Sequence, residues 1–88
     1  MDQLDVARAE INEVDHDMAA LFSRRMAAVA QVAAYKAEHG KAILDPEREA
    51  QVIARNTDLV EEALRPYYRE FLENMMAVSR AYQQDLIG

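Results

Sequence analysis

Two cationic side chains, Arg25 and Lys36, share one face of a predicted helix. They are 11 residues apart, a step of three full turns plus about 20° of rotation, and about 16 Å along the axis. Side chains of this length can lean into a pocket between them and bind a carboxylate there. Lys36 alone could instead stabilise the negative end of the helix dipole. Together the two residues indicate an anion-binding pocket.

Arg25 also interrupts an apolar seam that recurs every seven residues. The seam consists of Leu4, Ile11, Met18 and Val32 on one line, and of Ala7, Val14, Leu21, Ala28 and Tyr35 on the next. A polar residue in such a seam can fix the register of two paired helices, so this structural role stays open. The neighbouring Arg24 lies about 100° round the helix and is expected to be solvated.

A third stretch of helix carries a stripe that begins apolar and ends polar. Its members are Leu72, Met76, Ser79 and Gln83, at spacings of four, three and four residues. Residues at these spacings share one helix face. Ser79 and Gln83 are therefore candidates for hydrogen bonds to a ligand, unless they form a solvated edge of this helix.

The segment between these helices opens with a cluster of charge. Asp45 directly before Pro46 predicts a helix start, with the aspartate as N-cap and proline in the first turn. Arg48 and Glu49 follow in the first turn. A cation is unfavourable at the positive end of a helix dipole, so Arg48 is expected to have another task.

Arg8 is out of phase with this set. It precedes Arg25 by 17 residues, about 25 Å along the axis and about 100° short of whole turns. It cannot easily serve the same pocket from the same helix, but in a dimer of long helices it could reach the pocket of a partner.

No nucleophile–base pair, glycine-rich phosphate loop or metal-ligand constellation accompanies these residues, so no cofactor and no metal are expected. The set suits a small dicarboxylate, bound and ordered by cations.

Composition restricts the class of protein. The 88 residues contain two glycines, two prolines and no cysteine, which favours an all-helical fold without disulfides. The net charge of −6 argues against nucleic-acid binding. No apolar run approaches the roughly 20 residues of a membrane span, and no signal-peptide pattern is visible. We expect one soluble, cytoplasmic domain over residues 1–88 that binds neither nucleic acid nor membranes.

Three helices are predicted, over about residues 4–38, 46–64 and 66–86. Gly40 is a plausible C-cap of the first, and Arg65–Pro66 separates the other two. A first helix of this length spans about 52 Å, whereas a compact chain of this size has a radius of gyration of about 12 Å. Its seam therefore needs a partner, and we expect an intertwined homodimeric helical bundle.

With these residues in view, the chain resembles the all-helical chorismate mutase family. Four motifs in order carry the resemblance over nearly the whole chain: "ARAEINEVD", "SRRMAAVAQVAAYK", "ILDPEREA" and "AVSRAYQQ". The resemblance implies a dimer of three-helix protomers that converts chorismate to prephenate, without a cofactor, at the branch leading to phenylalanine and tyrosine.

The resemblance also implies residue roles. Arg25, with Ser79 nearby, would bind one substrate carboxylate, and Arg8 of the other protomer would bind the second. Lys36 would contact a carboxylate and the ether oxygen. Gln83 would donate to the same oxygen, where negative charge develops. Arg48 and Glu49 would lie by the ring hydroxyl, with Asp45 supporting that end.

Two other functions stay open. An isochorismate pyruvate-lyase would use the same scaffold and cations, although its relatives tend to have an apolar residue where this chain has Glu49. A non-catalytic dimeric helical interaction module would need Arg25 only for register. It predicts that Arg25→Leu keeps or raises the stability and removes nothing else.

Overall fold

The computed structural model describes residues 2–88, which form an all-helical chain. Its elements are α1 (Gln3–Glu38), α2 (Pro46–Thr57), the short 3-10 helix η1 (Glu62–Leu64) and α3 (Arg65–Ile87). No strand occurs among the described residues. The prediction of an all-α fold with one very long first helix is confirmed.

Capping at both ends accounts for the bounds of α1. The side chain of Asp2 accepts a hydrogen bond of 2.8 Å from the backbone N–H of Asp5, which satisfies a free donor of the first turn. At the other end, Gly40 has a φ of 62°, and the N–H of Lys41 donates to the carbonyl oxygen of Lys36 at 2.8 Å. That contact is the outer bond of a Schellman cap, which favours glycine.

The helix α2 begins as predicted but ends earlier. Asp45 is the N-cap and Pro46 opens the helix. The predicted end near Leu64 is wrong, because α2 ends at Thr57. The side chains of Asn56 and Thr57 donate to backbone carbonyls four residues earlier, at 2.8 and 2.5 Å. Such local side-chain bonds compete with the helical ladder and are typical of residues that form helices poorly.

The break before α3 therefore lies at residues 58–61, not at Arg65–Pro66. Pro66 stands in the first turn of α3, where its missing N–H costs nothing. The helix otherwise matches its predicted range to within one residue at each end. All four members of its polar-ended stripe are buried, as their spacing indicated: Leu72, Met76, Ser79 and Gln83.

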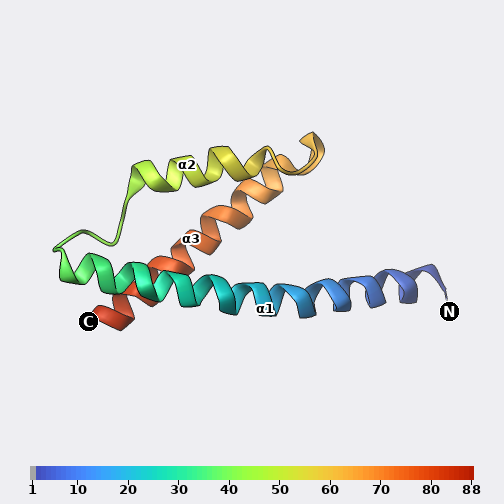
Figure 1. The fold of residues 1–88 in the computed structure, drawn as a ribbon. Helices are drawn as coiled ribbons and strands as arrows, with labels where there is room; N and C mark the ends of the chain where they lie inside the picture. Colours follow the sequence, from blue (N-terminus) through green and yellow to red (C-terminus); the bar gives the residue numbers. More distant parts are fainter. Residues whose placement is uncertain (1) are drawn as a thin grey trace.

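The helix α3 packs against both other helices and joins them (Figure 1). The helices α1 and α2 make no direct backbone contact with each other, so a space between them lies over α3. Only the C-terminal half of α1 takes part in this packing. The described residues of α1 before Arg25 are all exposed. The chain is consequently elongated, with a radius of gyration of 16.2 Å and a longest extent of 55 Å.

Candidate active site

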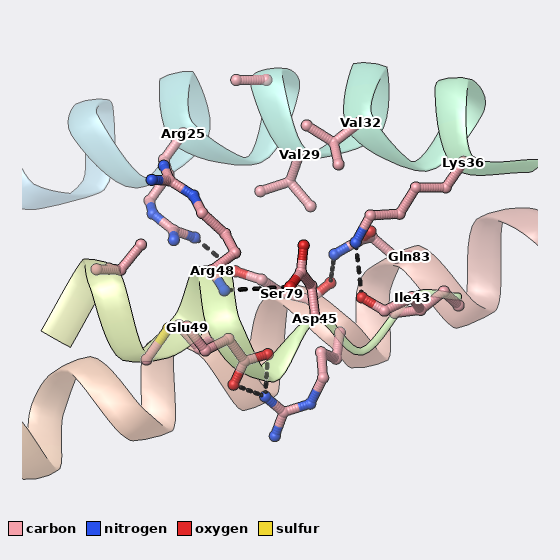
Figure 2. Close-up of a pocket in the computed structure, with 14 residues that line it drawn as sticks. Arg25, Val29, Val32, Lys36, Ile43, Asp45, Arg48, Glu49, Ser79 and Gln83 are labelled. Carbon is pink, nitrogen blue, oxygen red and sulfur yellow. Dashed lines mark hydrogen bonds and ion pairs between the residues drawn. The ribbon is translucent and has the colours of Figure 1, made fainter. Parts of the chain in front are cut away.

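The space between α1 and α2 contains a cavity of about 250 Å³ (Figure 2). The side of α1 contributes Arg25 and Lys36, α2 and the segment before it contribute Asp45, Arg48 and Glu49, and α3 contributes Ser79 and Gln83. Apolar side chains complete the lining, among them Val29, Val32, Ile43, Val52 and Met76. A small, partly apolar hollow with converging polar groups is typical of a small-molecule site.

The structure brings together seven of the eight predicted site residues, and Arg8 is the exception. Arg8 lies on the projecting part of α1, where it is exposed. Its distance of about 25 Å from Arg25 along the helix keeps it away from the cavity of its own chain. A role for Arg8 therefore requires a second protomer.

Arg25 reaches across the cavity to α3. Its Nη1 donates to Oγ of Ser79 at 2.5 Å, and the Ser79 hydroxyl donates in turn to the carbonyl oxygen of Met75 at 2.9 Å. The Ser79 side chain thus orients the guanidinium and is itself fixed by its own helix. Arg24, next to Arg25 in the chain, is exposed and absent from the lining.

Lys36 is anchored by the segment that connects α1 and α2. Its Nζ donates to the carbonyl oxygen of Ile43 at 2.7 Å, and Figure 2 shows this contact at one end of the cavity. An ammonium group has three donors. One of them positions the group, and the other two stay available for a ligand.

Gln83 is a buried polar group of the cavity that also has unused bonding capacity. Its Nε2 donates to the carbonyl oxygen of Ser79 at 3.3 Å, which leaves the second N–H of the amide free. Its Oε1 is buried without a hydrogen-bond partner among residues 2–88. Because the side chain is only 6% exposed, an unpaired amide there is unfavourable unless a ligand completes its bonds.

The first turn of α2 supplies two groups with different freedom. The Oδ1 of Asp45 accepts from the backbone N–H of Arg48 at 3.1 Å, so this carboxylate is held as an N-cap. The side chain of Arg48 is exposed, and within the described chain it forms no ion pair. A cation without a carboxylate partner at a cavity wall can bind an anion from outside.

Glu49 has a partner that the sequence did not reveal. Arg80 of α3 lines the cavity, and its Nη1 lies 2.5 and 2.6 Å from the two carboxylate oxygens of Glu49. The two residues are 31 positions apart on different helices. The available signal was local: Arg80 follows Ser79 directly and precedes Gln83 by one helical turn, so it borders the polar end of the α3 stripe.

The cavity is positive in a negative protein. Arg25, Lys36, Arg48 and Arg80 provide four positive charges, and Asp45 and Glu49 provide two negative ones, for a net charge of +2. The whole chain carries −6. This contrast favours an anionic ligand in the cavity, whereas the rest of the negatively charged surface repels anions.

Neither a metal site nor a membrane span is visible in the described part of the chain. Its His, Asp and Glu side chains form no cluster of three or more that could hold a metal ion. None of the helices in residues 2–88 is both long and apolar enough to cross a bilayer.

The fold and the cavity define an all-helical protein with a small cationic pocket suited to carboxylates. Comparison with known families agrees, since the model of the family described as chorismate mutase type II matches residues 7–84. The chain belongs to this family.

The chain is also similar to one curated protein. The chain is 37% identical over 84 residues to the T-protein of Haemophilus influenzae, a match that covers 84% of this chain. The chain spans only 22% of the length of that relative. No solved structure matches the chain.

Proposed function

We propose that the cavity between α1 and α2 is where this chain rearranges chorismate to prephenate. The observation that carries the proposal is the convergence of seven predicted site residues from three helices on one positive cavity. The substrate is a dicarboxylate, and the reaction is intramolecular: one C–O bond breaks and one C–C bond forms within the same molecule. It needs no cofactor and no proton transfer, only groups that order the substrate and stabilise developing charge.

Two arginines are assigned to the two carboxylates of the substrate. Arg25, oriented by Ser79, binds one carboxylate, and the partner's Arg8 binds the other. Two fixed clamps select the compact, chair-like conformer over the extended one. Holding reacting atoms close in this way lowers the barrier by replacing an entropic cost of the reaction with binding energy.

Lys36 and Gln83 are assigned to the ether oxygen of the substrate. Negative charge develops on this oxygen as the C–O bond breaks. Lys36 keeps two N–H donors beyond its bond to Ile43, and Gln83 keeps one. Donors that are already positioned in a cavity stabilise developing charge more strongly than mobile water does.

The residues on the α2 side of the cavity are assigned to the ring hydroxyl of the substrate. Glu49 accepts a hydrogen bond from this hydroxyl, Arg48 lies beside it, and Asp45 supports that end of the cavity by capping α2. The presence of a carboxylate at position 49 favours the mutase reaction over pyruvate release from isochorismate.

The apolar surface of a single chain supports a proposed dimer. Among the described residues, four apolar side chains are buried, Val29, Ala33, Leu72 and Met76, whereas eighteen large apolar ones are exposed. So small a core does not stabilise a domain by itself. The exposed set includes the seam of α1, and an apolar hollow of about 680 Å³ between α1 and α3 adjoins it. Because Met18 and Leu21 of the seam also line this hollow, a second copy that covers the seam would fill it as well.

A seam variant tests the dimer. Leu21→Asp places a charge in the apolar hollow, so we expect sedimentation to show dissociation of the 10.0-kDa chains and mutase activity to fall with it. His16→Asp is the matched control, because His16 is exposed on α1 outside both lines of the seam. A wild-type chain that sediments as a folded, active monomer would contradict the shared site.

The activity itself is tested with two substrates supplied separately. We expect loss of chorismate with prephenate as the product, and no more than a trace of pyruvate from isochorismate. Pyruvate release without prephenate formation would assign the lyase reaction instead.

We also propose that the chain acts in the cytoplasm, in aromatic amino acid biosynthesis.

A further inference from the structure

The described chain contains one ion pair, and it lies in the wall of the cavity. It joins Glu49 of α2 to Arg80 of α3, with 24% and 34% of the two side chains exposed. Figure 2 shows dashed lines from both carboxylate oxygens of Glu49 to one nitrogen of its partner. The pair is thus partly desolvated, and both of its residues line the cavity.

A free Glu49 carboxylate would compete with the substrate. Three other cations line the same cavity, Arg25, Lys36 and Arg48. Attraction between a carboxylate and a cation is stronger in a partly desolvated cavity than in water. If Glu49 were not held, its carboxylate could pair with one of these cations and occupy a site that a substrate carboxylate needs.

We infer that Arg80 is a positioning residue for the reaction. It holds the carboxylate of Glu49 against α3, where the carboxylate can accept a hydrogen bond from the hydroxyl of the substrate. It also keeps this carboxylate from pairing with the cations that bind substrate carboxylates. This inference rests on the proposed function, because it assigns the cations to chorismate.

The geometry of the pair supports such a role and suggests a rescue. Both contacts come from Nη1 alone, so the fork of the guanidinium is not used. A lysine ammonium could replace a single nitrogen, although the lysine side chain is shorter. In addition, Arg80 lies within one turn of Ser79 and Gln83, so one segment of α3 sets the positions of Glu49, Arg25 and the amide donor.

A double-mutant cycle tests the inference by steady-state kinetics with chorismate. We expect Arg80→Met to raise KM about tenfold with a smaller change in kcat, because substrate binding then competes with Glu49. In the Glu49→Gln background no carboxylate competes, so Arg80→Met should cause no further rise in KM. Arg80→Lys should recover part of the lost affinity, and Arg80→Gln replaces the Met variant if that variant does not fold.

The control is Arg69→Met, which removes an exposed arginine of the same helix that forms no ion pair and should leave KM unchanged. Additive effects of Arg80→Met and Glu49→Gln on KM would overturn the inference alone, as would a loss of thermal stability with an unchanged KM. A wild-type chain that does not convert chorismate would overturn both the proposed function and this inference.

Discussion

Replacing Arg25 by leucine should remove turnover and leave a folded dimer. The guanidinium binds a substrate carboxylate in the proposed mechanism, so we expect kcat/KM to fall about a hundred- to thousand-fold. Stability should stay equal or rise, because leucine restores the apolar seam. Ser79 would not be left unpaired, since its hydroxyl also donates to the carbonyl oxygen of Met75.

The measurement combines mutase kinetics with denaturant unfolding of the same preparation. Arg24→Leu is the matched control, because Arg24 is exposed, lies next to Arg25 and does not line the cavity. It should change the rate little. A stable Arg25→Leu dimer with the wild-type rate would show that the arginine fixes register only, and the site would have to lie elsewhere.

Mixing two inactive variants should restore activity if each site uses both protomers. Arg8→Ala and Lys36→Ala should each be nearly inactive alone. After subunit exchange about half of the dimers are mixed, and one of the two sites in each mixed dimer keeps both residues. We therefore expect activity to recover to about a quarter of the wild-type value.

A second mixture provides the control. Arg25→Leu and Lys36→Ala remove residues that line the cavity of the same protomer, so no mixed dimer contains a complete site and activity should not return. Mass spectrometry of the dimers confirms that exchange has taken place. No recovery in the first mixture, with exchange confirmed, would exclude a contribution of Arg8 across the interface.

The length of α1 could be predicted because its signals are local. No glycine or proline interrupts it, Asp2 caps one end and Gly40 the other. The stripe of α3 could also be predicted, because helical periodicity alone places Ser79 and Gln83 beside buried Leu72 and Met76. These two faces and the start of α2 together predicted the seven residues that line the cavity.

The end of α2 and the role of Arg80 could not be predicted in the same way. Pro66 is the strongest helix breaker in this part of the sequence, yet α2 ends earlier, at Thr57, where the side chains of Asn56 and Thr57 donate to carbonyls four residues back. The role inferred for Arg80 depends on its ion pair with Glu49, which forms only when α2 and α3 pack together. A contact between residues far apart in sequence leaves no periodic signal along either helix.

The structure of the dimer with a stable dicarboxylate analogue of the cyclic transition state tests the shared site most directly. We expect one carboxylate on Arg25 and the other on the partner's Arg8, with Lys36 and Gln83 donating to the position of the ether oxygen. An analogue that binds outside this cavity, or one whose two carboxylates are both held by a single protomer, would contradict the account.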